Sequence, residues 1–163
     1  NTTGNGGGIS SINKAMRSIV ENCKIKKNRA NGYGGGVHLE CISNLNSYDA
    51  GTFYNVEITN NYAGKSGNDV STEAYGLKSS DVTMGGKVVI GDCYLEDGSL
   101  VKNIIHIKNQ LTSDSRIGIT SNNPVNWKKI TAYNDRDYSA NFYYSGQGHK
   151  IVNYGQYLYI YQS

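Results

Sequence analysis

The segment VENCKIKKNRANGYGGGVHLE at residues 20–40 repeats without a gap as FYNVEITNNYAGKSGNDVSTE at residues 53–73. The offset of 33 aligns Asn22 with Asn55, Ile25 with Ile58, Asn28 with Asn61, Ala30 with Ala63, Gly34 with Gly67, Val37 with Val70 and Glu40 with Glu73. Upstream, TTGNGGGI (2–9) matches ANGYGGGV (30–37) with an offset of 28, and VVIGDC (88–93) matches VEITNN (56–61) with an offset of 32. A period of this length is typical of a solenoid, in which each repeat packs on its neighbours.

The local pattern within the repeat indicates strands. VHLEC (37–41) and FYNVEI (53–58) alternate residue by residue, and this period of two is typical of strands. A helical solenoid needs two amphipathic helices per repeat, and only INKAMRSIVENC (12–23) comes near that pattern. The equivalent segment of the next repeat contains Gly51, so we interpret 12–23 as a loop and a strand. We therefore predict an all-β fold: a parallel β-helix of about three coils, each of 28–33 residues, with a β-rich C-terminal cap.

In such a fold, equivalent residues of neighbouring coils stack about 4.8 Å apart. The interior then contains an aliphatic stack of Ile25, Ile58 and Ile90. On the outside, Lys24 lies beside Glu57, a favourable cross-strand pair of opposite charges.

The turns of the repeat are predicted from glycine and asparagine. We expect the runs Gly6–Gly8 and Gly34–Gly36 to supply left-handed backbone conformations. Asn28 and Asn61 fit a turn ladder, since asparagine tolerates a left-handed backbone and its amide can bond to the same group one coil away. Cys93 takes the third place in that column, so the ladder is expected to end there.

Composition and charge exclude several classes of protein. The chain has 163 residues, which fits one domain, and its net charge of +3 is too weak to indicate binding to nucleic acid. No apolar run approaches the ~18–20 residues of a spanning helix, so we expect no membrane segment. The 20 Gly, 20 Asn and 14 Tyr, with a single Pro, favour a turn-rich β protein.

The three cysteines form no recognisable metal-binding pattern. None of Cys23, Cys41 and Cys93 lies in a CxxC motif, and no histidine follows them at zinc-finger spacing. We expect buried or unpaired thiols rather than a metal site, while a Cys23–Cys41 disulfide stays open.

The second half of the chain has denser strand patterns and no glycine runs. The expected strands are 87–92, 103–108, 116–120, 128–133, 140–145, 149–153 and 156–161. A stacked-coil fold needs its exposed end covered, and the aromatic residues of this half are a reasonable cover. We divide the chain into β-helix coils at 1–84 and the final coils with an aromatic-rich cap at 85–163, within one continuous domain.

One group of outward side chains is a candidate for catalysis. Glu40 and Glu73 are expected to stack one coil apart, with His38 and Asp69 beside them. Two carboxylates about 5 Å apart could carry out retaining glycoside hydrolysis or bind Ca²⁺. The alternative, which we favour, is a solvated polar face of a strand.

A second group of residues is a candidate for ligand binding. Trp127 with Lys128 and Lys129, or the tyrosines at 138–144 and 154–161, could stack on sugar rings, although packing within the cap is the commoner role. The binding candidates are Trp127, Tyr143 and Tyr144. The GGG runs at 6–8 and 34–36 are not followed by GK[ST] and open no helix, so they do not indicate phosphate binding. We expect no cofactor.

The repeat phrases resemble those of a known class of protein. NGGGIS (5–10), NRANGYGGGV (28–37) and GTFYNVEITNNYAGKSGNDV (51–70) resemble the right-handed parallel β-helix repeats of bacterial adhesin-like and polymorphic outer-membrane surface proteins. Residues 85–120 resemble the segments that close such helices in large secreted proteins. The resemblance implies a right-handed coil, a secreted or cell-surface location, a fragment of a longer chain, and no catalytic residues.

Together these observations lead to an expected function and one alternative. We expect a non-catalytic, structural, adhesin-like segment of a larger bacterial surface protein, which displays a face for host or self glycan or protein. Further N-terminal coils would belong to the parent chain. The alternative is the C-terminal fragment of a polysaccharide-degrading lyase or glycosidase, with Glu40 and Glu73 in or near its cleft.

Overall fold

The computed structural model describes residues 4–13, 17–42 and 49–163, and within these ranges the chain is all-β. Residues 14–16 of the segment 12–23, which we interpret as a loop and a strand, lie outside the described residues. The helical structure in the described ranges is the short 3₁₀ turn η1 (Ser139–Asn141). The strands are β1 (Ile9–Asn13), β2 (Ser18–Lys26), β3 (Arg29–Ala30), β4 (Val37–Cys41), β5 (Asp49–Thr59), β6 (Tyr62–Ala63), β7 (Val70–Glu73), β8 (Asp81–Glu96), β9 (Ile105–Leu111), β10 (Arg116–Ser121), β11 (Lys128–Lys129), β12 (Phe142–Tyr144), β13 (His149–Tyr154) and β14 (Tyr157–Gln162).

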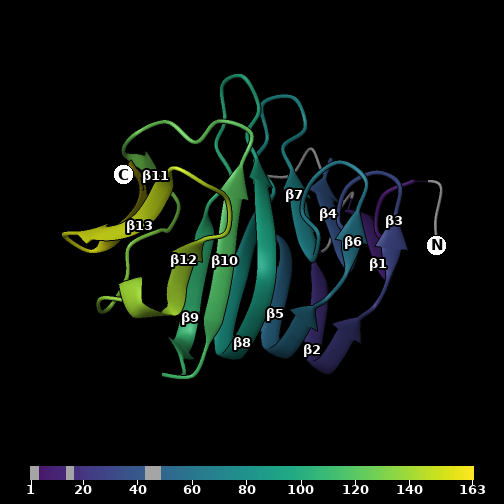
Figure 1. Cartoon of the computed structure of the whole chain (residues 1–163), viewed down its shortest axis with the longest axis horizontal. Coiled ribbons are helices and arrows are strands. Elements are labelled where there is room, and N and C mark those ends of the chain that lie inside the picture. The colour runs from purple at the N-terminus through teal and green to yellow at the C-terminus, as the bar shows by residue number, and fades with distance from the viewer. Residues whose placement is uncertain (1–3, 14–16, 43–48) are drawn as a thin grey trace.

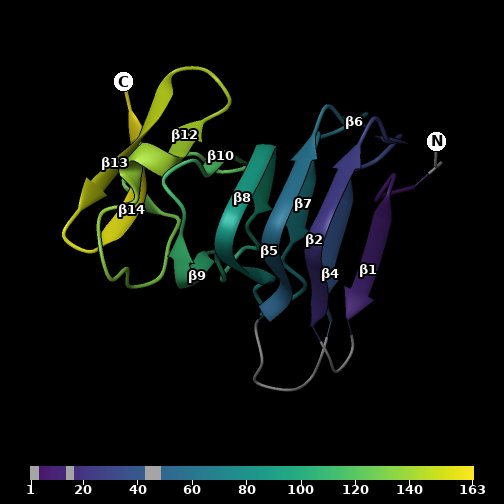
Figure 2. The same cartoon turned by 90° about the horizontal axis from the view of Figure 1, so that it is seen from below.

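Most strands pair in parallel with the equivalent strand of the next repeat. One ladder follows the order β1-β4-β7-β8-β10-β12, a second joins β2, β5, β8 and β9, and a short third joins β3 to β6. Figures 1 and 2 show these strands following one another from the N-terminal end to the C-terminal end along the long axis. The apolar core lies between the ladders.

The observed pairing confirms the register that the repeat predicts. Ile25 lies opposite Ile58, which in turn lies opposite Ile90. The same stack continues beyond the prediction, through Ile117 to Phe142. The offset of 28 is confirmed as well, by the pairing of β1 with β4. The repeat therefore sets which side chains share a layer of the core.

The glycine runs serve two different purposes. Gly34 has the predicted left-handed backbone, with φ of +64°. Gly35 is needed for a different reason, since a Cβ atom there would lie 2.3 Å from the carbonyl oxygen of Tyr62 and 2.4 Å from that of Asn68. Glycine at this position lets the backbones of adjacent repeats approach each other closely.

Asparagine columns line two corners of the repeat. The predicted ladder is present, because the backbone N and Nδ2 of Asn28 both donate to Oδ1 of Asn61, at 3.0 and 3.2 Å. The expectation that these two residues are left-handed is wrong. The left-handed column instead contains Asn22 and Asn55, each with φ of 52°, and Gly86. Asn28 and Asn61 contribute their amides rather than an unusual backbone.

The alignment places Cys93 in the same column as Asn28 and Asn61, at a corner of the repeat, but the chain has no corner at this residue. The strand expected at 87–92 is part of the 16-residue β8, which pairs with β5 and β9 in its first half and with β7 and β10 in its second. Cys93 therefore lies opposite Val70 in the core, and placing it in the asparagine column was wrong. The division drawn between residues 84 and 85 falls inside this strand.

The chain ends in a separate three-stranded antiparallel sheet, here called the C-terminal sheet, with the order β11-β14-β13. Leu158 and Ile160 of β14 are buried against the main core. All three cysteines are free, so the open question of a Cys23–Cys41 disulfide is answered in the negative. The part of the chain that the structure describes includes no helix with the length and apolar character to cross a membrane.

Candidate functional site

The C-terminal sheet has one buried face and one face that is rich in aromatic rings. Residues of β14 alternate, so Leu158 and Ile160 enter the core while Tyr157, Tyr159 and Tyr161 lie on the opposite face. Because successive side chains of a strand point to opposite faces, the sequence YLYIY places three tyrosines in a row on one surface.

Trp127 packs on this row from the segment before β11. Its ring centroid lies 5.1 Å from that of Tyr161 and 5.7 Å from those of Tyr159 and Tyr154, each in an edge-to-face arrangement. Trp127 stays 49% exposed and Tyr154 69% exposed. We call Trp127, Tyr154, Tyr157, Tyr159 and Tyr161 the aromatic face.

Two features of the aromatic face are unusual for simple packing. Trp127 has a left-handed backbone with φ of 63°, a costly conformation for a bulky residue. Lys129 and Lys150 place their ammonium groups 4.8 and 5.4 Å from the ring centroids of Tyr157 and Tyr161. The result is a set of rings, exposed at Trp127 and Tyr154 and half-buried at the other three, with positive charge at its margin.

The structure separates the other two predicted binding residues from this face. Tyr143 and Tyr144 lie on β12, which pairs with β10 of the main ladder. The Tyr143 hydroxyl donates to the Gly91 carbonyl at 2.8 Å, and the Arg116 guanidinium covers its ring at 4.5 Å. Tyr144 packs against the core and the ring of His149. These contacts give both tyrosines a packing role.

Three of the four predicted catalytic candidates do come together. The ligand atoms of His38, Glu40 and Glu73 all lie within 4.8 Å of one another. Glu40 lies opposite Glu73, as the repeat predicts, and Glu96 lies opposite Glu73 on the next strand. We call these four residues the histidine–glutamate cluster.

Asp69, the fourth predicted candidate, is not part of the cluster. It is buried at a corner, where Oδ1 accepts hydrogen bonds from the backbone N and Nδ2 of Asn61, at 3.0 and 2.9 Å. Its Oδ2 accepts from the backbone N of Asp92 at 3.0 Å. The expectation of an outward Asp69 is wrong because three donors at the corner need an acceptor.

His38 was also expected on a solvated face, and that is wrong. Its side chain alternates away from the core with Glu40, yet it is only 1% exposed. Nδ1 lies 2.7 Å from Ser71 Oγ, while Nε2 lies 3.4 Å from Asn5 Nδ2 and 3.6 Å from Glu73 Oε2. Burial lowers the pKa of His38 to about 4, which keeps the imidazole neutral at neutral pH.

Two glutamates of the cluster, Glu40 and Glu96, have raised pKa values. Burial, and then the charge of Glu73, raises the pKa of Glu40. The pKa of Glu96 is raised in the same way by burial and by Glu73, and Lys65 opposes this rise. Carboxylates at equivalent positions of adjacent strands repel each other, so the column favours a bound proton or cation.

Acid is expected to weaken the fold through His38. In metal-free buffer, we expect wild type to lose up to about 3 kcal/mol of unfolding free energy, relative to His38→Gln, between pH 6.5 and about 4. In this window the unfolded chain binds a proton on histidine and the folded chain does not, so protons favour unfolding. The raised pKa values of Glu40 and Glu96 act in the opposite direction, in both proteins. Urea unfolding at stepped pH measures the difference, and a difference independent of pH contradicts the prediction.

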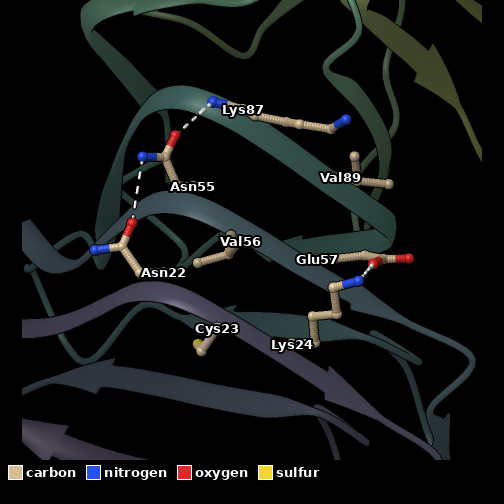
Figure 3. Close-up of a pocket in the computed structure, with 8 residues that line it drawn as sticks. All are labelled: Asn22, Cys23, Lys24, Asn55, Val56, Glu57, Lys87 and Val89. Carbon is tan, nitrogen blue, oxygen red and sulfur yellow. Dashed lines mark hydrogen bonds and ion pairs between the residues drawn. The ribbon is translucent and has the colours of Figure 1, made fainter.

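A shallow groove of about 720 Å³ crosses β2, β5 and β8 (Figure 3). Along one side, Asn55 donates through Nδ2 to Asn22 Oδ1 at 3.3 Å and accepts from the backbone N of Lys87 at 3.0 Å. Along the other side, Lys24 pairs with Glu57 at 3.4 Å, which confirms the predicted pair. The polar groups of the groove bond to one another, so we assign it a structural role.

Tyr154, Tyr157, Tyr159 and Tyr161 belong to the tyrosines that the sequence analysis names as candidates for stacking on sugar rings. The alternation of Tyr157, Tyr159 and Tyr161 is the signal that places these three on one face. Sequence reasoning missed Glu96, because the aligned segment 88–93 ends three residues before it on the same strand. No family model, curated protein or solved structure matches the chain.

Proposed function

We propose that this chain is a segment of right-handed parallel β-helix that serves as a non-catalytic scaffold in an extracellular, adhesin-like surface protein. The support for the fold is the in-register parallel pairing of repeats 28, 32 and 33 residues apart. The proposed location rests on the resemblance of the repeat motifs to bacterial surface proteins.

The scaffold would display the aromatic face to a glycan. The observation that carries this proposal is Trp127, a half-exposed indole on a left-handed backbone, packed beside exposed Tyr154. Flat aromatic rings suit the apolar C–H faces of sugars, and their rigidity keeps the entropic cost of binding low. Because Lys129 and Lys150 lie at the margin, the preferred glycan is one that carries carboxylates or sulfates.

The test is binding of the chain to immobilised polysaccharides, uronic-acid-containing and neutral. We expect the acidic set to be preferred at low salt, and Trp127→Ala and Tyr154→Ala each to weaken binding at least tenfold, or about 1.4 kcal/mol. Tyr75→Ala is the matched control, since Tyr75 is 57% exposed and lies outside the aromatic face. Binding that both variants retain, or that Tyr75→Ala reduces equally, would overturn the proposal.

A polysaccharide-degrading enzyme is the second candidate, favoured by one observation. Glu40, with a raised pKa, lies beside Glu73, which is the arrangement of an acid and a nucleophile in retaining glycosidases. The same polysaccharides can be analysed for shortened chains after incubation. Cleavage abolished by Glu73→Gln would favour the enzyme over the scaffold.

A further inference from the structure

Metal-binding groups from two neighbouring strands converge in the histidine–glutamate cluster. His38 and Glu40 come from β4 and Glu73 from β7, and their ligand atoms lie within 4.8 Å of one another. In a tetrahedral Zn²⁺ site with ligands at about 2.1 Å, the ligand atoms lie about 3.4 Å apart. The 3.6 Å between His38 Nε2 and Glu73 Oε2 is close to this spacing. Small rotations of the two partly exposed glutamates would close the rest of the gap.

His38 is a separate observation from the row of carboxylates. It is 1% exposed, and its Nε2 is directed at Glu73 while Nδ1 contacts Ser71 Oγ at 2.7 Å. When Nδ1–H donates to Ser71, the lone pair of Nε2 faces the carboxylates. A second hydrogen bond of this kind orients most histidines that bind metals. The amide of Asn5, 3.4 Å from Nε2, is the group that an ion would displace.

We propose that His38, Glu40 and Glu73 form a binding site for a divalent first-row transition metal ion, with Zn²⁺ as the expected occupant. One imidazole nitrogen and two carboxylate oxygens are ligands that Zn²⁺ accepts in a four-coordinate site. Ca²⁺ takes six to eight oxygen ligands, and a buried imidazole does not suit it. Glu96, next in the column, or water would supply the fourth ligand.

A metal at this position would act on the fold as well as on the cluster. It would join β4 to β7 through their side chains and neutralise part of the repulsion between Glu40 and Glu73. A ligand that binds only the folded chain stabilises it by mass action. The melting temperature should therefore rise with the concentration of Zn²⁺.

The test is calorimetric titration of the whole chain, after dialysis against a chelator, with Zn²⁺ or Ca²⁺ alone. We expect one Zn²⁺ per chain, a raised melting temperature, and no displacement by excess Ca²⁺. Glu40→Gln and Glu73→Gln should each weaken Zn²⁺ binding at least tenfold. Ser71→Ala, which removes no ligand, should weaken it about tenfold through the orientation of His38.

The controls separate this site from other donors. Glu57→Gln should leave Zn²⁺ affinity unchanged, because Glu57 of β5 is paired with Lys24 and Lys26 of β2. The titrations are made in a Cys23→Ser background, since Cys23 is a half-buried free thiol. The absorption of bound Co²⁺ should then lack the charge-transfer bands of a thiolate. Absence of Zn²⁺ binding, or Zn²⁺ affinity that survives both glutamate substitutions, would overturn the proposal.

Discussion

Replacing Lys128 by alanine is expected to lower the free energy of unfolding by about 3–5 kcal/mol, as the loss of one partner from a buried ion pair does. Lys128 points into the core beneath the C-terminal sheet, and its Nζ lies 2.7 Å from Asp97 Oδ2. The two side chains are 0% and 3% exposed. Nζ also donates to Ser121 Oγ. Without Lys128, the carboxylate of Asp97 would stay buried without a counter-charge.

Urea unfolding of Lys128→Ala and two companion variants measures this effect. Lys129→Ala is the matched control, because the neighbouring lysine is exposed on the opposite face, and losing its contact with the Tyr157 ring should cost about 1 kcal/mol or less. The double variant Lys128→Met, Asp97→Asn should recover part of the loss, since it removes the unpaired charge and keeps an acceptor for Asn103 N. A loss of unfolding free energy below about 1 kcal/mol in Lys128→Ala, or no recovery in the double variant, would contradict the assignment of Lys128 and Asp97 as a buried ion pair.

Replacing Asp69 by alanine is expected to cost about 3 kcal/mol, because it leaves buried donors without an acceptor. The two oxygens of Asp69 accept three hydrogen bonds, two from Asn61 and one from the backbone of Asp92. They connect the corner before β7 to Asn61, between β5 and β6, and to Asp92 in the second half of β8. The loss should be visible in the melting temperature and in the urea midpoint.

Asp114→Ala is the matched control for Asp69→Ala. Asp114 pairs with Lys87 at 2.6 Å, but both side chains are more than half exposed. Exposed pairs of this kind contribute about 1 kcal/mol or less. Equal losses in the two variants would show that the buried hydrogen bonds of Asp69 add nothing beyond a surface charge.

The sequence predicted the order of the strands and the register between them because both depend on a period. Ile25, Ile58 and Ile90 stack as predicted, since a shift of one residue would turn every apolar side chain away from the core. The approach of Glu40 to Glu73 followed from the same offset. A repeat therefore predicts which residues of adjacent repeats lie side by side, even where the local composition is typical of loops.

The features that sequence reasoning missed depend on individual contacts rather than on the period. His38 alternates outward like Glu40, yet it is buried and contacts Asn5 and Ser71, which lie 33 residues away along the chain on either side. Asp69 carries an ordinary charged side chain, and only the donors at its corner draw it inward. Lys128 is buried beside exposed Lys129, which no pattern in the sequence indicates.

The unbroken course of β8 affects how the chain loses its structure. In a solenoid with separate strands, each repeat touches only its neighbours, and terminal repeats can detach one at a time. Here one strand pairs with β5 and β9 and also with β7 and β10, so a single segment holds rungs of both main ladders. If β8 loses its pairing in one ladder, its pairing in the other ladder is disturbed as well. We therefore expect the middle of the molecule to unfold cooperatively, while repeats further from this shared strand can open before it does.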